Sequence, residues 1–330
     1  MKVLIFGITG NSGRHLAEFY LSIGSEVWGV GRRKDAAGLE QVNYISFDIQ
    51  DRRDFARLPS EFDLVINLAG VQPSILNFSE ATDLFTTLRE YVDVNVRGIY
   101  NVLEYVAQAD IGTYIYATTH RDYELYWKNQ NFLDNDLPPA INYEGDHAMY
   151  AITKVMGRMM GDYMVPMSGT RCFNVRLPMM FLVPEWPYYL SDGVAHSMPF
   201  LKIIRDAIDG RPLEVWGDPN MQRDYVYIDN LVRVINGCYK SSLRKGTFSV
   251  GTGEAVSTEM FVKSIGNIFG SSQTIYKYRP EKRTYKSAVY NISEQKELLG
   301  YRPVLLDEML QKMKVKLFDE GYLERWGWLR

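Results

Sequence analysis

The 330-residue sequence predicts an α/β protein with a doubly wound parallel sheet and a smaller C-terminal lobe. Short apolar runs alternate with helical stretches up to residue 177, and a glycine-rich turn directly follows the first run. Beyond residue 177 the alternation gives way to clustered prolines and aromatic residues. Neither a repeat nor a low-complexity linker separates the two regions, so the second region is expected to pack on the first.

The strands and helices of the first region follow from the spacing of apolar residues. Within the apolar runs there is no alternation with polar residues, which suits strands buried on both faces. Between the runs, residues such as Ile99, Val102 and Val106 recur at helical spacing. Strands that alternate with helices in this way pair in parallel. The predicted strands are residues 3–6, 27–30, 42–47, 64–68, 114–117 and 170–177, and the predicted helices are residues 10–22, 94–109 and 147–164.

The second region has a different character. Prolines and aromatic side chains fill residues 178–199, which are expected to form a loop over a cleft rather than a membrane helix. A helix is predicted at residues 201–209, where Gly210 and Pro212 end it. A short strand at 213–216, a segment at 224–232 and a helix at 305–317 complete this part of the chain.

Composition and charge exclude several classes of protein. The formal net charge is −3 and the sequence pI is about 5.9, so no nucleic acid partner is expected. Two cysteines, Cys172 and Cys238, cannot build a disulfide framework. The sequence shows no secretory signal and no apolar run of about 18 residues. We therefore expect a cytoplasmic protein without membrane contact, and predict no metal site.

The glycine turn Gly7-x-x-Gly10-x-x-Gly13 ends the first strand and opens the first helix. Glycines at these points let the backbone turn tightly and approach a pyrophosphate, while the helix N-terminus offers free N–H groups. This placement is typical of Rossmann-type dinucleotide binding, although a purely structural glycine turn remains the alternative. The predicted cofactor contacts here are Gly7, Thr9, Gly10, Asn11, Ser12 and Gly13.

The tip of the second predicted strand indicates which dinucleotide is preferred. An acidic residue there would bind a ribose 2′-hydroxyl, whereas arginine suits a 2′-phosphate. This chain has Arg32 and Arg33 and no carboxylate at the tip. We therefore predict NADP(H) as the preferred cofactor, with NAD(H) possible and a solvated basic loop as the alternative interpretation. After the third strand, Asp48 is placed either to bind the adenine amino group or to cap the following turn.

A tyrosine and a lysine four residues apart, Tyr150 and Lys154, share one face of a predicted helix. A tyrosine normally titrates near pH ~10, and a nearby ammonium favours its phenolate. This pair is therefore predicted to be catalytic rather than a surface pair. A second match, Tyr278 and Lys282, is interrupted by Pro280 and cannot share an unbroken helix.

Thr119 follows the strand predicted at residues 114–117, at the edge of the sheet where parallel sheets place ligands. Its hydroxyl is predicted to share a hydrogen bond between the substrate hydroxyl and Tyr150. Thr118 is the competing candidate, and simple β-propensity explains either threonine without a function.

These motifs resemble the extended short-chain dehydrogenase/reductases, specifically the NAD-dependent epimerase/dehydratase family that modifies nucleotide sugars. The likeness covers nearly the whole chain. The residues that carry it are Gly7-x-x-Gly10-x-x-Gly13, Asp48-Ile49, Asn67-Leu68-Ala69-Gly70, Asn95-Val96-Arg97-Gly98, Tyr150-x-x-x-Lys154, Arg171-Cys172-Phe173-Asn174-Val175, Arg223-Asp224-Tyr225 and Tyr278-Arg279-Pro280 with Arg283.

The resemblance implies roles for further residues. Ile49, Leu68 and Ala69 would lie along the cofactor, with Lys154 also anchoring its nicotinamide ribose. Asn174, Arg223 and Arg283 would bind the substrate, and two arginines suit a diphosphate; structural ion pairs are the alternative for the arginines. The resemblance also implies that residues 1–176 form the NAD(P)-binding domain, to which 213–250 partly return, and that 177–330 mainly bind the nucleotide sugar.

Departures from the family narrow the expected reaction. In the family's 4,6-dehydratases an acidic residue follows the catalytic threonine or serine, but here His120 and Arg121 follow Thr119, which disfavours dehydration. His120 either acts as an acid or base or only forms a hydrogen bond. Arg176-Leu177-Pro178 replaces the family's usual Tyr-Gly-Pro. The resulting prediction is NADPH-dependent C4 keto-reduction, with a redox-neutral 4-epimerase as the alternative and a non-catalytic NADP(H) sensor as a third reading.

The predicted helix at residues 147–164 also indicates self-association. From residue 151 onward it is apolar over much of its circumference, whereas a helix buried on one side needs a single apolar stripe. Its methionines suit an adaptable interface. Together with residues 94–109, this helix is expected to form a four-helix homodimer core, as the resemblance also implies.

Overall fold

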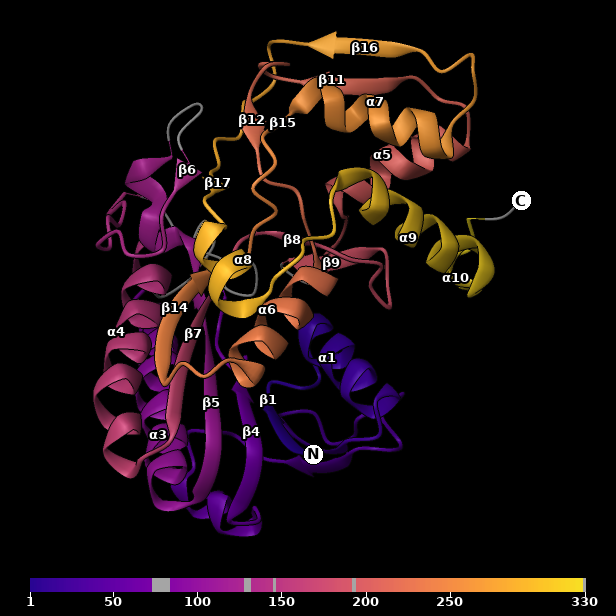
Figure 1. The fold of residues 1–330 in the computed structure, drawn as a ribbon. Coiled ribbons are helices and arrows are strands. Elements are labelled where there is room, and N and C mark those ends of the chain that lie inside the picture. Colours follow the sequence, from indigo (N-terminus) through magenta and orange to yellow (C-terminus); the bar gives the residue numbers. More distant parts are fainter. Residues whose placement is uncertain (73–83, 128–131, 145–146, 192–193, 329–330) are drawn as a thin grey trace.

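The fold is a seven-stranded parallel sheet with helices on both faces and a smaller lobe above its carboxyl edge (Figure 1). This computed structural model describes residues 1–72, 84–127, 132–144, 147–191 and 194–328. The strand order is β14-β7-β5-β4-β1-β2-β3, and every neighbouring pair is parallel. The predicted fold class is therefore confirmed. The strands are β1 Lys2–Phe6, β2 Glu26–Gly31, β3 Asn43–Ser46, β4 Glu61–Asn67, β5 Asp110–Thr119, β7 Arg171–Leu177 and β14 Lys245–Ser249.

Alternate residues of the central strands enter two separate cores, one on each face of the sheet. On β1, Val3 and Ile5 join one apolar cluster while Leu4 and Phe6 join the other. All four are fully buried, which explains why the strand sequences show no polar alternation. The helices are α1 Asn11–Ser22 and α6 Ile228–Lys240 on one face, and α2 Leu84–Val92, α3 Ile99–Gln108 and α4 Ala148–Met164 on the other.

The helix predicted at residues 94–109 differs from the structure in its first turns. Residues Asp93–Gly98 form a π-helical segment, and the α-helix α3 begins only at Ile99. A Cβ at Gly98 would lie 2.8 Å from Cγ1 of Ile49, so the segment packs closely on the loop after β3. Wide turns of this kind occur often at functional sites, and here the segment carries the buried Asn95.

The C-terminal lobe is assembled from short strand pairs and helices. β11 (Leu213–Trp216) pairs with β16 (Tyr276–Arg279) beside α5 (Pro199–Ile208) and α7 (Thr258–Phe269). A hairpin of β9 (Tyr188–Ser191) and β10 (Val194–Ser197) precedes α5, and α9 (Leu306–Asp319) and α10 (Tyr322–Arg325) follow. Smaller pairs join β6 Phe132–Leu133 to β17 Val289–Tyr290, β8 Met180–Phe181 to β13 Val226–Tyr227, and β12 Gln222–Arg223 to β15 Val256–Ser257. The remaining elements are the 3-10 helices η1 Arg52–Arg57, η4 His120–Tyr126 and η5 Val165–Ser168, and α8 Ser293–Leu299.

The lobe and the sheet domain share one continuous core. The apolar cluster that contains Val3 and Ile5 of β1 also contains Leu213 of β11 and Met309 of α9. Within residues 213–250, β11 lies in the lobe, whereas α6 packs on the sheet and β14 extends it. The second region is thus packed directly on the first.

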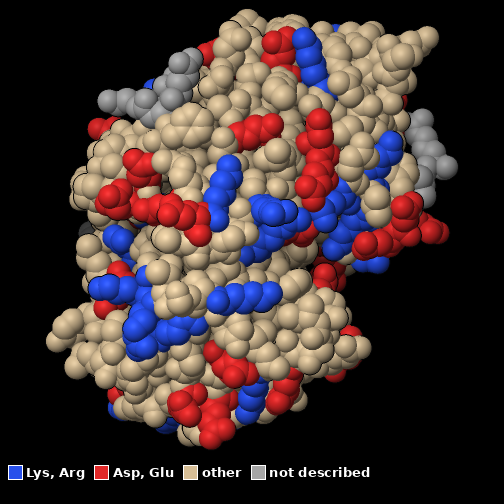
Figure 2. Space-filling view, viewed as in Figure 1, with Lys and Arg blue, Asp and Glu red and all other residues tan. Residues whose placement is uncertain are grey.

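The surface facing the viewer carries mixed charge, with basic side chains gathered most densely across the middle of the molecule (Figure 2). No uniform basic field of the kind that nucleic acid binding requires covers this face. In the part of the chain that the structure describes, no helix combines the length and apolar character needed to cross a bilayer.

Candidate active site

The glycine turn lies between β1 and the loop that follows β4. Gly7 has a φ of 81°, a conformation that side chains disfavour. A Cβ at Gly7 would approach the Ala69 backbone N to 2.9 Å, and one at Gly13 would lie 2.4 Å from the Gly7 carbonyl oxygen. The turn therefore packs tightly against Ala69 and against the start of α1. A ligand would approach the turn from the side opposite Ala69.

The start of α1 fits a dinucleotide phosphate. Gly10 at its N-cap has no side chain that could satisfy the first N–H groups, and its first turn contains no acidic residue. Asn11 and Ser12 contribute exposed or half-exposed N-terminal positions of this helix. Thr9 lies beneath the tip of β2, where a Cβ at Gly31 would come within 2.9 Å of its Oγ1. Free N–H groups and the positive end of a helix dipole suit a pyrophosphate here.

The two arginines at the tip of β2 are exposed. Among the described residues, the ion-pair partner of Arg32 is distant, with Arg32 Nη1 3.9 Å from Oε1 of Glu90. The Arg33 backbone oxygen accepts a hydrogen bond from the Tyr44 hydroxyl at 2.6 Å, which fixes the backbone while the guanidinium points away from the core. Both side chains are therefore available to an anion.

The remaining predicted cofactor residues line the loops beside the turn. Asp48 accepts hydrogen bonds from the backbone N and Nε2 of Gln50, at 3.0 and 3.3 Å, so it caps the turn. Ile49 is buried against Gly98. The backbone N of Leu68 donates to the Phe6 oxygen and that of Ala69 donates to Asn67 Oδ1, which keeps this loop close to Gly7.

Thr119, Tyr150 and Lys154 come together at the carboxyl edge of the sheet. The last residue of β5, Thr119, forms a hydrogen bond with the Tyr150 phenol and also accepts one from the Arg121 backbone N at 3.2 Å. Lys154 lies one turn beyond Tyr150 on α4 and is only 4% exposed. Its Nζ lies 4.5 Å from the ring centroid of Tyr116. Thr119 and the half-buried Tyr150 thus meet at this edge, with the buried Lys154 one helical turn away.

Asn95 ties this group to the loop beside the glycine turn. Its Oδ1 accepts from the Val71 N at 2.8 Å, and its Nδ2 donates to the Val71 O and to Thr153 Oγ1 at 3.1 and 3.2 Å. Thr153 precedes Lys154 on α4. The π-helical segment that presents Asn95 therefore links α4, which carries the predicted catalytic pair, to the proposed cofactor loop.

Burial dominates the electrostatics of the pair. It raises the pKa of the Tyr150 phenol, and the Thr119 hydrogen bond and the nearby Arg121 only partly oppose this. Burial also lowers the pKa of Lys154 from 10.5 to about 7. Lys154 is not among the groups that shift the Tyr150 pKa in the chain by itself, so its role in favouring the phenolate beside a bound nicotinamide stays a prediction.

His120 has a structural role that the sequence left open. Its Nδ1 lies 3.0 Å from the hydroxyl of Tyr290 on β17, and its ring centroid lies 4.7 Å from that of Trp127. Burial, reinforced by Arg121, holds the histidine pKa well below its usual value. His120 is therefore neutral near pH 7 and joins η4 to a strand of the C-terminal lobe.

A buried ion pair beneath the site was not predicted. Arg176 Nε donates to both carboxylate oxygens of Asp122, at 2.9 and 3.1 Å, and its Nη1 donates to Ser249 Oγ at 3.0 Å. Its Cζ lies 3.7 Å from the Tyr123 ring centroid. The pair fixes η4, which directly follows Thr119. The signal in the sequence was Arg176 itself, which stands where the family has tyrosine.

At the substrate end, Arg223 and Arg283 converge on one residue. Arg223 Nη2 donates to the Tyr285 backbone oxygen at 3.0 Å, and Arg283 Cζ lies 5.1 Å from the Tyr285 ring centroid. Arg223 Nε is buried without a hydrogen-bond partner among the described residues. The lobe therefore brings two guanidinium groups together, and the Nε of Arg223 is one N–H donor that could still bind a ligand.

Asn174 is not part of this group. Its side chain is buried within β7, where Nδ2 donates to Asp162 Oδ1 of α4 at 2.7 Å. β7 pairs Asn174 with Tyr116, three positions before the pair of Thr119 and Leu177 that ends the ladder. The expected substrate contact is therefore replaced by a bond between strand and helix, because the residue lies too far below the edge of the sheet.

Known proteins share this architecture. The chain resembles a probable UDP-glucuronate 4-epimerase of Rhizobium meliloti, with 27% identity over 71% of this chain and 67% of the relative. It also resembles a dTDP-4-dehydro-6-deoxy-D-allose reductase of Streptomyces bikiniensis, with 24% identity over 70% of each chain. The fold matches a UDP-glucuronic acid 4-epimerase from Bacillus cereus in complex with NAD, with a TM-score of 0.70 and 20% identity over 97% of this chain and 98% of that one.

The model of one protein family matches residues 3–251, which include the glycine turn, the three predicted catalytic residues and Arg223. The matched residues make up most of the chain and contain all seven strands of the sheet except Lys2, the first residue of β1. The chain belongs to the NAD-dependent epimerase/dehydratase family.

Proposed function

We propose that this protein reduces the 4-keto group of a nucleotide sugar with NADPH, through proton transfer from Tyr150. The observation that carries the proposal is the placement of Thr119 beside Tyr150 at the carboxyl edge of the sheet, one helical turn from the buried Lys154. This edge is where parallel sheets place their ligands, and the open start of α1 lies at the same edge. The Streptomyces relative named above is a reductase of a 4-dehydro sugar.

The protonation of Tyr150 and Lys154 suits reduction. When bound, a reduced nicotinamide supplies the hydride. Because burial raises the pKa of Tyr150, the phenol keeps its proton until a ketone oxygen takes it up. Thr119 orients that oxygen through its hydroxyl. Lys154, with a pKa of about 7, can pass a proton toward the tyrosine after the transfer.

The substrate class is supported by the arginines of the lobe. Arg223 and Arg283 meet at Tyr285, and planar guanidinium groups bind diphosphate oxygens in pairs. The unpartnered Nε of Arg223 is a buried donor that a diphosphate would satisfy. A nucleotide sugar offers this diphosphate between its base and the reacting ring.

The cofactor preference follows from Arg32 and Arg33. Both are exposed, and residues 31–34 at the tip of β2 include no carboxylate of their own to bind a 2′-hydroxyl. Arg32→Asp is expected to weaken NADPH binding at least tenfold relative to NADH. Arg52→Asp, at an exposed arginine of η1, is the matched control and should leave the ratio unchanged. An unchanged ratio in Arg32→Asp would remove the basis for NADP and leave NAD as the cofactor.

A 4-epimerase is the second candidate function. The Rhizobium relative and the Bacillus cereus structure both bear that name. In this reaction the same tyrosine would first accept the sugar's hydroxyl proton and later return it. The raised pKa of Tyr150 disfavours that first step unless a bound oxidised nicotinamide supplies positive charge.

Cofactor stoichiometry separates the two candidates. The protein is incubated with NADPH and either UDP-4-keto-glucose or UDP-glucuronate, and products are counted against oxidised cofactor. Consumption of one NADPH per reduced sugar supports the reductase. Interconversion of C4 epimers without added cofactor would contradict it and establish the epimerase instead.

We also infer a homodimer through α3 and α4. Several large apolar side chains on the outer face of these helices are exposed in the single chain: Tyr100, Met156, Met159 and Tyr163. Such a contiguous apolar face marks an interaction site. Met159→Glu is expected to yield a monomer by light scattering at micromolar concentration, whereas Met179→Glu, at an exposed methionine elsewhere, should not. A monomeric wild-type mass would contradict the inference.

A further inference from the structure

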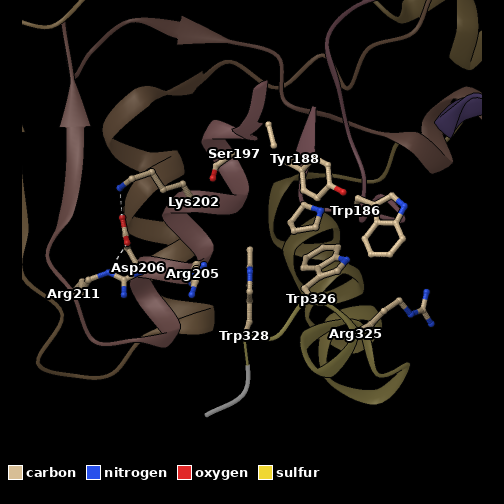
Figure 3. A pocket seen from close by; sticks show the side chains of 12 residues that line it. Trp186, Tyr188, Ser197, Lys202, Arg205, Asp206, Arg211, Arg325, Trp326 and Trp328 are labelled. Carbon is tan, nitrogen blue, oxygen red and sulfur yellow. Dashed lines mark hydrogen bonds and ion pairs between the residues drawn. The ribbon is translucent and has the colours of Figure 1, made fainter. Parts of the chain in front are cut away.

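A pocket of about 520 Å³ lies in the C-terminal lobe, apart from the proposed active site (Figure 3). Its walls are the β9–β10 hairpin with the residues just before it, the outer face of α5, and the segment around α10. None of the residues proposed for proton transfer, cofactor or diphosphate lines it. Its volume falls within the range of small-molecule sites, about 300–1,000 Å³.

One side of the pocket is aromatic. Three of the six tryptophans in the chain line it, together with Tyr188. The rings of Trp186 and Tyr188 lie 6.3 Å apart at 31° and are 49% and 40% exposed. Trp326 is fixed by its Nε1, which donates to the Glu185 backbone oxygen at 2.9 Å. Large ring faces held open in this way favour a ligand that covers them.

The other side is cationic. Lys202 Nζ and Arg211 Nε each lie 2.7 Å from the carboxylate of Asp206, so two cations share one anion. Asp209, beside the pocket, pairs with Arg205 Nε at 3.7 Å and also with Arg211 Nη1. Asp206 is the one carboxylate on the pocket wall, against four cationic side chains with Arg325 included. With Asp209 counted as well, four cations face two carboxylates, and this smaller excess of positive charge favours an anionic ligand.

The two sides meet at Trp328. Arg205 Cζ lies 5.2 Å from the Trp328 ring centroid, and the Trp328 and Trp326 rings are 4.9 Å apart at 65°. Figure 3 shows Trp328 standing between the cations of α5 and the other rings. A ligand that touches both sides must therefore join a ring, whose face can lie on the aromatic side, to an anionic group within a few bonds.

We propose that this pocket binds a small phosphorylated ring compound, a nucleotide or a sugar phosphate. The ring stacks on Trp186 and Tyr188, because aromatic faces bind bases and sugar rings. The phosphate lies on Lys202, Arg205 and Arg211, since guanidinium groups match phosphate oxygens. This second site goes beyond the proposed reduction and needs none of its residues.

The test measures binding of UMP, glucose 1-phosphate and inorganic phosphate to the full chain, by calorimetry and by quenching of tryptophan fluorescence. Binding of UMP or of glucose 1-phosphate with quenching supports the proposal and identifies the ring. Inorganic phosphate is expected to bind at least tenfold more weakly, because it lacks the stacking group. Equal binding of all three probes, or no binding at millimolar concentration, overturns the proposal.

Variants locate the site. Trp186→Ala and Lys202→Ala are each expected to weaken probe binding about tenfold. Lys263→Ala is the matched control for the lysine, since Lys263 also pairs with a carboxylate four residues away, at 2.8 Å against 2.7 Å for Lys202. Melting temperatures show that each variant is folded.

Arg223→Ala separates this site from the proposed active site. Probe binding that survives Arg223→Ala but fails in Lys202→Ala supports a second site. The opposite pattern places the probe at the active site and overturns the proposal. Reductase activity is measured separately, so a failure of the proposed function leaves the binding result readable.

Discussion

The sheet domain and the C-terminal lobe build their ligand groups in opposite ways. In the sheet domain the glycine turn and the Tyr150–Lys154 pair each lie within one short segment. In the lobe, Arg223 meets Tyr285 from a segment 62 residues away. The local sequence therefore determines the groups in the sheet domain. The arginine pair of the lobe depends instead on which short strands pair with each other. The predictions that follow probe each side of this comparison, beginning with the largest expected effect.

A side chain at Gly13 should disrupt the sheet domain most. In Gly13→Ala the new Cβ would lie 2.4 Å from the Gly7 oxygen and 2.6 Å from Ile8 Cα, both on the backbone. We expect loss of dinucleotide binding and a melting temperature lower by more than 10 °C, roughly the effect of several kcal/mol. In the control Gly10→Ala the Cβ meets the Gly7 oxygen at 3.4 Å, an ordinary contact, so the fold should survive. Similar melting of both variants would show that the turn is not tightly packed.

Breaking the buried pair beneath the site should cost nearly as much. Arg176→Met leaves the Asp122 carboxylate buried and unpaired, which typically costs about 3–5 kcal/mol of unfolding free energy. Arg57→Met removes an exposed partner of Asp54 and should cost less than about 1 kcal/mol. Denaturant unfolding measures both. Equal losses would mean that the Arg176 pair does not hold η4.

Lys154 should make stability depend on pH in a stated direction. Its pKa falls from 10.5 in the unfolded chain to about 7 in the folded one, so the folded state binds fewer protons between these values. The wild type therefore loses stability as pH falls from about 10.5 to 7, and no more below that. Lys154→Met lacks this loss and should gain about 2 kcal/mol or more over the wild type at pH 7.

Unfolding of Lys154→Met and the wild type across this pH range checks the prediction. A difference between the two proteins that stays constant from pH 7 to 10.5 contradicts it. Loss of activity in the same variant is expected as well, but it does not bear on the titration.

The smallest effects distinguish the two candidate substrate contacts. Arg223→Ala should raise the KM for a nucleotide sugar about tenfold, because a charged donor to the diphosphate is lost. Asn174→Ala should leave KM unchanged, since its amide bonds Asp162 far below the edge of the sheet. Steady-state kinetics measures both. A raised KM in Asn174→Ala would return that residue to the site.

Most of the sheet domain could be predicted because its signals are local. Apolar runs gave six of the seven strands of the sheet, and spacing placed Tyr150 and Lys154 on one helix. The seventh strand, β14, was not predicted as a strand, because it lies beyond residue 240, far along the chain from the other six strands of the sheet. The π-helical segment at residues 93–98 was not predicted either. It depends on the close packing of Gly98 against the Ile49 side chain, which the sequence does not show.

The site residues that were missed or misplaced all depend on distant partners. Arg176 meets Asp122 across 54 residues, and His120 meets Tyr290 across 170. Asn174 lies in the segment that resembles the family's substrate-binding strand, but it is three positions before the end of β7. The burial that raises the pKa of Tyr150 and lowers that of Lys154 was not predicted either, because burial is a property of the packed fold rather than of the motif.

Single-turnover oxidation of NADPH by a 4-keto nucleotide sugar tests whether Tyr150 is the acid of the reaction. Tyr150→Phe removes only the phenol oxygen and should slow the turnover at least about a hundredfold, with NADPH binding unchanged. The matched control Tyr143→Phe, at an exposed tyrosine, should react like the wild type. Normal turnover in Tyr150→Phe would contradict the assignment of the proton to this residue.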